Sequence, residues 1–205
     1  MKTILISFFI IIFGAHEFCN SQNSVTIGSQ EWSMNLNIKQ FRNGDPIPRA
    51  KTAAEWKKAA ENKEPAWCYY NNDPSTSDKH GLLYNWFAVN DDRGLAPEGW
   101  KVASKQDWET LLGNYPKHNH AYPLKTKEGW KGGFYGSNSS NFSAYPVGIR
   151  GVPNFFHQGK MVIYWTSTEL TDEDAFGVTF DASQKNTTRS PQYKTMGLSV
   201  RCVKN

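Results

Sequence analysis

The sequence lacks most of the features that identify a function class. It has 3 Cys in 205 residues, and its longest apolar run is shorter than the roughly twenty residues that a membrane-spanning helix needs. Its net charge is only +4, with no basic run longer than Lys57-Lys58, which argues against a nucleic-acid partner. Serine-hydrolase, zinc-protease and phosphate-loop motifs are also missing. The composition is instead rich in aromatic residues, at 14%, which favours one loop-rich, partly β domain.

The N-terminus has the pattern of an export signal. Lys2 precedes Ile4–Phe13, an apolar run of about ten residues, which suits a signal peptide. We predict a signal peptide at residues 1–21 and an exported mature chain in the periplasm, at the outer-membrane surface or outside the cell. Cys19 could instead be lipidated, although the residues before it are larger than a lipidation site requires.

The cysteines predict a cross-link. Cys68 and Cys202 are the two that remain if the signal is removed. In an oxidising compartment a pair of thiols is usually bridged, so we predict a Cys68–Cys202 disulfide. It would close a loop of about 135 residues and contribute at most roughly 5 kcal/mol. The alternative is a pair of buried thiols.

Aromatic residues predict where the core lies. Half of the 8 Trp fall within Trp67–Leu112, together with several Tyr and Phe. Large aromatic side chains bury the most apolar area, so this segment should supply the centre of the core.

Local signals predict the elements around that core. Gly28-Ser29 should form the turn of a hairpin, and Thr52 and Ser104 should each start a helix, because Glu55 and Asp107 follow at capping-box spacing. Leu82–Val89 could be strand or helix. Asn114–Asn141 is expected to be irregular. Four later strands are expected at Phe142–Arg150, Met161–Ser167, Ala175–Asp181 and Leu198–Val203. In the last strand, alternation predicts Leu198, Val200 and Cys202 inward, and Ser199, Arg201 and Val203 outward.

Several motifs point to one family. WCYYNNDP, HGLLYNWFAV, RGLAPEGWKV, FSAYPVGIR, YWTSTE and GLSVRCVK occur in this order along the chain. Together they resemble the Fibrobacter succinogenes major paralogous domain (FISUMP), found in secreted and surface proteins, over nearly all of residues 22–205. The family is related to the formylglycine-generating (sulfatase-modifying) enzymes. The resemblance implies a single α+β, C-type lectin-like domain with two helices, small antiparallel sheets and a long irregular loop region. It also implies that Cys202 lies beside the early part of the fold, which is consistent with a bridge to Cys68.

Enzymatic chemistry is not predicted. Formylglycine-generating enzymes hold copper through two closely spaced cysteines near the C-terminus, whereas Cys202 has no second Cys near it. The His-x-x-x-His cluster of related iron enzymes is also missing. We therefore expect no catalytic residues, no cofactor and no metal.

Other patterns have a simpler structural explanation. Val152-Pro153-Asn154 and Trp165-Thr166-Ser167 follow the order of a lectin calcium site but lack its oxygen ligands, so we expect a turn and a core Trp. His118 and His120 could bind a metal, but two His in a loop are usually solvated. Asp91-Asp92-Arg93 and Asp172–Asp174 are expected to be turns.

Aromatic residues in or beside the irregular region are the candidate binding residues. We predict a partner or ligand site at Trp130, Phe134, Tyr135, Phe155, Phe156 and His157. The same residues could instead seal the loop onto the domain. The leading interpretation is a non-catalytic, exported interaction module that docks on an envelope or outer-membrane protein. A carbohydrate-binding or adhesion domain is the alternative, and a formylglycine-generating-type oxidoreductase is the least favoured.

Overall fold

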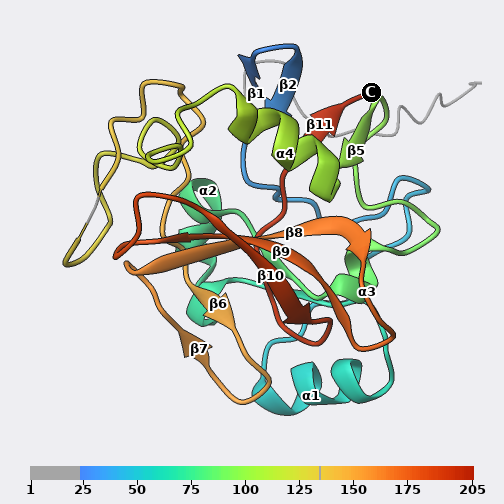
Figure 1. Cartoon of the computed structure of the whole chain (residues 1–205). Coiled ribbons are helices and arrows are strands. Elements are labelled where there is room, and N and C mark those ends of the chain that lie inside the picture. The colour runs from blue at the N-terminus through green and yellow to red at the C-terminus, as the bar shows by residue number, and fades with distance from the viewer. Residues whose placement is uncertain (1–23, 134) are drawn as a thin grey trace, which may run out of the picture.

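The computed structural model describes residues 24–133 and 135–205. The predicted signal peptide, Cys19 and Phe134 lie outside the described residues. The described chain is a mixed α/β structure with four α-helices and several small antiparallel sheets (Figure 1). None of the helices in these residues has the length and apolar character needed to cross a membrane.

Two longer helices begin where the sequence predicts. Helix α1 spans Ala53–Glu61 and helix α4 spans Lys105–Gly113, and each starts with a complete capping box. The expectation of two helices was too low, because α2 (Ser77–His80) and α3 (Trp86–Val89) add one turn each. The ambiguous apolar segment contains both structures. It forms strand β4 (Leu83–Tyr84) and then α3, whose first turn is capped by the Asn85 side chain. Two short 3-10 helices, η2 and η3, precede α2 at Tyr70–Asn72 and Pro74–Thr76.

One sheet joins the two ends of the described chain. Its strand order is β1-β2-β11-β5. The predicted hairpin is confirmed, with Gly28 at φ 58° in its turn, a conformation that glycine adopts readily. The strands are β1 (Ser24–Ile27), β2 (Gln30–Ser33), β11 (Cys202–Lys204) and β5 (Trp100–Val102).

A second sheet has the order β10-β9-β8 and forms the middle of the molecule. Its strands are β8 (Met161–Glu169), β9 (Asp174–Asp181) and β10 (Thr188–Tyr193). Two small pairs complete the fold: β3 (Trp67–Cys68) with β4, and β6 (Ile149–Arg150) with β7 (Phe155–Phe156). Strands β7 and β10 were not predicted, and of the strand expected at Phe142–Arg150 only β6 is formed.

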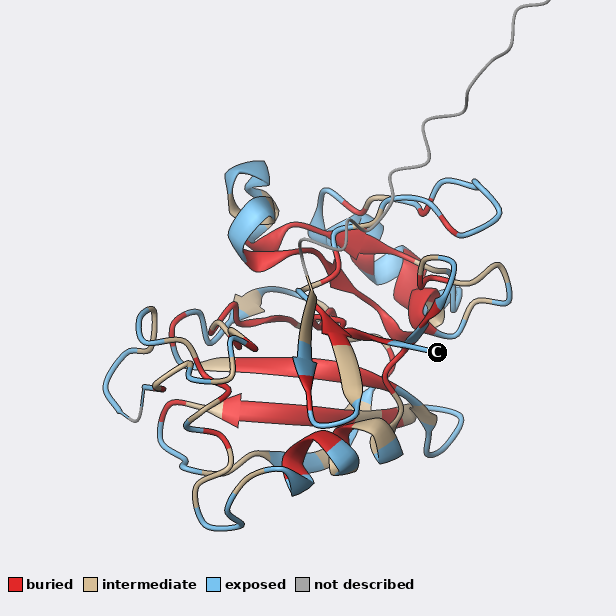
Figure 2. Ribbon diagram, turned by 90° about the horizontal axis from the view of Figure 1, so that it is seen from above, coloured by how far each residue is buried: buried red, intermediate tan, exposed pale blue. Residues whose placement is uncertain are grey.

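The aromatic residues pack into two clusters (Figure 2 shows the buried strands). Trp108 is fully buried at the centre of the first, with its ring centroid 4.8 Å from that of Trp32 and 5.2 Å from that of Tyr164. Trp67, Trp86 and Trp100 belong to the second. The expectation that Trp67–Leu112 supplies the core is therefore confirmed, although it supplies two packed clusters and not one.

The predicted alternation near the C-terminus was wrong on one face. Ser199, Arg201 and Val203 were expected outward, yet all three are buried. The final segment runs between the two clusters: Cys202 packs in the second and Val203 in the first. This segment is covered on both faces and therefore has no side that faces solvent. Successive side chains point alternately into one cluster and into the other.

The predicted disulfide is not formed. Cys68 lies on β3 in the first cluster and Cys202 on β11 in the second, and both are thiols. The sheets that carry the two strands are different, which the number of cysteines could not reveal. Burial raises the pKa of the Cys68 thiol to about 12, against the opposing effect of the Arg150 guanidinium.

Candidate functional site

The long irregular region packs against one end of the β10-β9-β8 sheet. Between α4 and β6 the described residues contain no helix or strand, which agrees with the prediction for Asn114–Asn141 but not with the strand expected from Phe142. Two backbone hydrogen bonds attach this region to the turns at that end, and a third joins the two turns to each other. The amide of Lys131 donates to Gly159 O at 2.6 Å, that of Ala121 donates to Lys185 O at 3.2 Å, and that of Ala182 donates to Lys160 O at 2.7 Å. We call residues 114–133, 135–136, 156–160 and 181–187 the loop end; Figure 1 shows these segments beside the start of β8 and the end of β9.

Backbone packs directly on backbone within the loop end. A Cβ atom at Gly133 would lie 2.0 Å from the carbonyl oxygen of Ala182. A Cβ atom at Gly136 would lie 2.0 Å from that of Lys125. Such contacts are too close for any side chain, so the glycines fix how the irregular region sits on the sheet.

The Lys125 side chain stabilises the packing of the irregular region on the turn after β9. This side chain is buried, and its Nζ donates to Asp181 O at 2.6 Å and to Gln184 O at 2.8 Å. The ammonium also lies 4.7 Å from the ring centroid of Trp130, a cation–π distance. Burial lowers the pKa of Lys125 to about 8, and the nearby Asp181 carboxylate opposes that shift.

A hollow of about 350 Å³ is lined in part by the Lys125 side chain. Two exposed rings stand at it, Tyr122 with 43% and Tyr135 with 60% of its surface accessible. The volume is at the lower end of the range for small-molecule sites. The residues around the hollow are Asn119, Tyr122, Lys125, Gly133, Tyr135, Gln184 and Lys185.

The predicted binding residues divide into exposed and packed ones. Tyr135, Phe156 and His157 are exposed, Phe156 with 41% accessible. Trp130 is half-buried, and its Nε1 donates to Thr126 Oγ1 at 3.1 Å. Phe155 is partly buried against the core.

The structure brings the two predicted groups together. The Lys131–Gly159 hydrogen bond joins the segment of Trp130 and Tyr135 to the turn after Phe156. Tyr122 was missed by the sequence reasoning. It lies in the same irregular region, so its aromatic character was the available signal.

His118 and His120 differ in their surroundings, and His118 is exposed. His120 is half-buried, and its Nε2 accepts the Thr187 N–H at 2.9 Å, which ties the loop to the residue before β10. The pKa of His120 is lowered, chiefly by burial. Among the described residues no group of three or more His, Cys, Asp or Glu side chains is placed to hold a metal ion.

Most of the remaining patterns have the structural roles that were expected, although Asp174 belongs to β9 and not to a turn. Asp91 accepts the backbone N–H of Arg93 at 3.0 Å and forms an ion pair with its Nε at 2.8 Å. Pro153 lies in the turn between β6 and β7, where Gly151 N–H donates to Asn154 O. Trp165 is fully buried, and its Nε1 donates to Tyr84 O.

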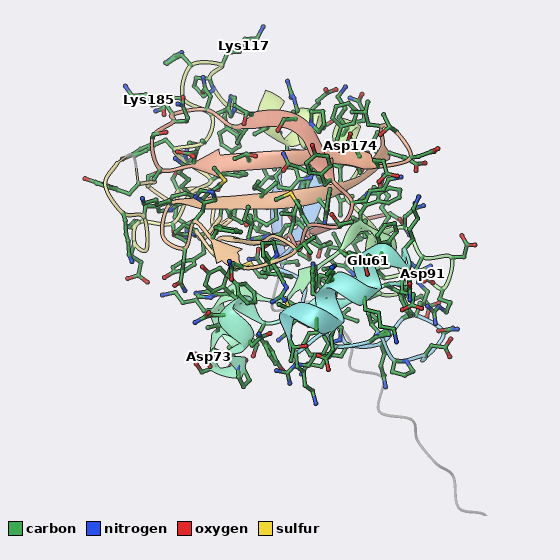
Figure 3. All side chains as sticks on the ribbon, turned by 90° about the horizontal axis from the view of Figure 1, so that it is seen from below. Glu61, Asp73, Asp91, Lys117, Asp174 and Lys185 are labelled. Carbon is green, nitrogen blue, oxygen red and sulfur yellow. The ribbon has the colours of Figure 1, made fainter. Side chains whose placement is uncertain are left out.

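The irregular region carries more basic than acidic residues. Glu128 is the only carboxylate residue between Glu109 and Glu169. Lys117 and Lys185 project at the loop end in Figure 3, whereas Asp174 lies toward the opposite end of the sheet. The basic residues between the two flanking glutamates are Lys117, Lys125, Lys127, Lys131, Arg150 and Lys160.

Together these features define a small mixed α/β domain with a basic, aromatic loop end. Residues 25–204 match the model of the Fibrobacter succinogenes major domain, and the chain belongs to this family. No curated protein and no solved structure matches the chain. The C-type lectin-like fold and the relation to formylglycine-generating enzymes therefore remain predictions.

Proposed function

We propose that this protein is a non-catalytic, exported interaction module that docks through its loop end on an acidic surface of an envelope protein. The observation that carries the proposal is the exposure of Tyr122, Tyr135 and Phe156 on a rigid, backbone-packed frame. The C-type lectin-like fold implied by the family resemblance is part of the same proposal.

Physical reasons favour a protein partner. Aromatic side chains that are exposed and held on a fixed frame lose little conformational freedom on binding, and they commonly anchor protein interfaces. The surrounding lysines would attract a partner that carries carboxylates and would raise the association rate at low salt. In this proposal the exposed aromatic side chains and the lysines of the loop end contact the same partner.

A pull-down tests the proposal. The purified protein, immobilised and exposed to a detergent-solubilised envelope fraction, should retain one protein in stoichiometric amount, and less of it at high salt. The double variant Tyr122→Ser/Tyr135→Ser should bind that protein at least tenfold more weakly. The matched control is Tyr193→Ser, because Tyr193 is 66% exposed but lies on β10 beside Asp174, away from the loop end. Equal loss in the control variant, or retention by the double variant, would contradict docking at the loop end.

A glycan array separates the carbohydrate-binding alternative. Strong, competable glycan binding that is lost in the Tyr122→Ser/Tyr135→Ser variant would replace the protein partner with a saccharide. Stoichiometric copper or iron in the purified protein would instead favour the oxidoreductase alternative.

A further inference from the structure

A buried arginine lines a second hollow, which is larger than the one at the loop end. Arg201 has 1% of its surface accessible, and no ion pair involving it is present in residues 24–133 and 135–205. Its guanidinium donates to Asn35 Oδ1 at 2.8 Å, Ser33 O at 2.7 Å and Ser143 O at 3.2 Å, which are all neutral acceptors. A buried charge is normally paired, because removal from water is costly for an ion that lacks a counter-charge.

The guanidinium also lies 4.3 Å from the ring centroid of Phe142 and 5.6 Å from that of Tyr164, cation–π distances that offset part of this cost without supplying a counter-charge. Its contact with Met34 is weak. Arg201 Nη1 lies 3.7 Å from the thioether sulfur of Met34, and sulfur is a poor hydrogen-bond acceptor. Met34 is 37% exposed and lines the same hollow, so a flexible surface side chain covers the guanidinium. An oxygen anion in place of the sulfur would bind this donor more strongly.

The hollow has a volume of about 820 Å³, within the range of small-molecule sites. Residues of α2 and of the irregular region both line it, so it lies between them. Its walls are rich in amides and hydroxyls: Asn35, Asn37, Asn138, Ser77, Thr126 and Ser143. Tyr145 also lines the hollow, and its ring is held by stacking on His80 at a centroid distance of 4.9 Å and by the Lys79 ammonium 4.6 Å from its centroid. Lys79 and Glu128, which also line the hollow, form an ion pair at 3.0 Å that ties α2 to the loop.

We propose that this hollow binds a sugar acid, with the carboxylate of the sugar on the Arg201 guanidinium and its hydroxyls on the surrounding amides. The planar guanidinium matches a carboxylate better than any other common anion-binding side chain does. The amide and hydroxyl walls suit a hydroxylated ring. This site is separate from the exposed aromatics of the loop end and does not rest on the function proposed for them.

A structural role alone would give Arg201 the same hydrogen bonds, since it ties the end of β2 to Ser143 in the loop. Binding measurements separate the two roles. Isothermal titration of the full mature protein with galacturonate and glucuronate oligosaccharides should show binding, and neutral oligosaccharides of the same length should bind at least tenfold more weakly. If no acidic oligosaccharide binds at millimolar concentration, or if neutral and acidic ones bind equally, the proposal is wrong.

Two variants locate the site without disturbing the core. Asn37 is exposed and lines the hollow, so Asn37→Trp should fill it and weaken binding at least tenfold. Gln106→Trp places the same side chain at an exposed position on α4, outside the hollow, and should bind like the wild type. Tyr122→Ser/Tyr135→Ser should also bind the sugar acid normally. Unchanged binding by Asn37→Trp would overturn the assignment.

Two further experiments test whether the carboxylate of the ligand binds the Arg201 guanidinium. Arg201→Lys keeps the charge but loses the two-pronged geometry, and it should weaken binding at least tenfold while circular dichroism shows an intact fold. If that variant unfolds, Asn37→Trp decides. A carboxylate could also come from the C-terminus of a peptide. The binding of a tripeptide with a free C-terminal carboxylate should therefore be compared with that of the same tripeptide as its C-terminal amide. Tighter binding of the peptide acid than of any sugar acid would show that the ligand is a peptide terminus and refute the proposal.

Discussion

The buried ammonium of Lys125 should make the protein more stable as the pH rises above neutral. Burial lowers the folded-state pKa of this lysine from 10.5 to about 8. Between these two values the unfolded chain binds a proton that the folded chain has released, so the free energy of unfolding increases with pH. Below about pH 8 both states are protonated and the dependence disappears.

The expected size follows from the pKa difference. Each pKa unit corresponds to about 1.4 kcal/mol, so raising the pH from 7 to 9.5 should stabilise the protein by about 2 kcal/mol through this group. The Cys68 thiol opposes this effect, because its pKa is raised from 9.0 to about 12 by burial, so above pH 9 the unfolded chain ionises and the folded chain does not. This costs about 1 kcal/mol of stability at pH 9.5, and it does so equally in the wild type and in a Lys125 variant. The pKa values of His80 and His120 are lowered from 6.5, and those of Tyr84 and Tyr164 are raised from 10, so these groups contribute little between pH 7 and 9.5.

Urea unfolding at a series of pH values between 7 and 9.5 measures the effect. Lys125→Met should lack the rise, whereas the exposed Lys117→Met, the matched control, should keep it. The slope is more informative than stability at one pH. The variant removes a buried charge but also leaves the carbonyls of Asp181 and Gln184 without their ammonium donor, at roughly 1–3 kcal/mol each. Parallel pH profiles for wild type and Lys125→Met would refute the reasoning.

Three further outcomes follow from the core and its helices. Trp108→Ala should lower the free energy of unfolding by about 3–5 kcal/mol in urea denaturation, because it empties the centre of the first cluster. Thr52→Ala should cost about 1 kcal/mol in the same assay by removing the N-cap of α1, whereas Thr110→Ala, at an exposed position of α4, should cost less. Dithiothreitol should leave the melting temperature unchanged, and alkylation of the unfolded protein without reductant should label Cys68 and Cys202; a decrease in melting temperature on reduction would indicate a bridge.

Local signals predicted the elements that local chemistry determines. Thr52 with Glu55 and Ser104 with Asp107 start helices because their side chains satisfy backbone amides within one turn. Gly28 marks its hairpin because the turn needs a positive φ. Each of these depends on residues close together in the sequence, so the pattern was sufficient.

Elements that depend on distant partners were not predictable. Strand β10 is polar, contains Pro191 and forms because it pairs along β9 at the sheet edge. Proline is tolerated there because it lacks only a donor that an edge strand need not use. The outward prediction for Arg201 failed for the same reason, since nothing near it in sequence shows that a second cluster covers that face.

The sequence indicated where the candidate site lies but not which contacts hold its loops in place. An irregular, aromatic segment indicated the right region, and Tyr135 and Phe156 are exposed there. The buried state of Lys125 was invisible, because its acceptors are carbonyls about sixty residues further along the chain. A lysine in a polar stretch is ordinarily expected to be solvated.

Buried cations explain how a region without helix or strand holds one shape. Backbone carbonyls outside regular structure need donors, and unsatisfied ones are costly. Arg201 supplies a donor to Ser143 within the irregular region, and Lys125, from that region, supplies donors to Asp181 and Gln184 in the turn after β9. The two hollows lie beside these two side chains, so each is formed before a ligand arrives. A preformed site does not lose the conformational entropy that a flexible loop would lose on binding. The hydrogen bonds of Lys125 and Arg201, and not the exposed rings alone, should therefore determine the affinity.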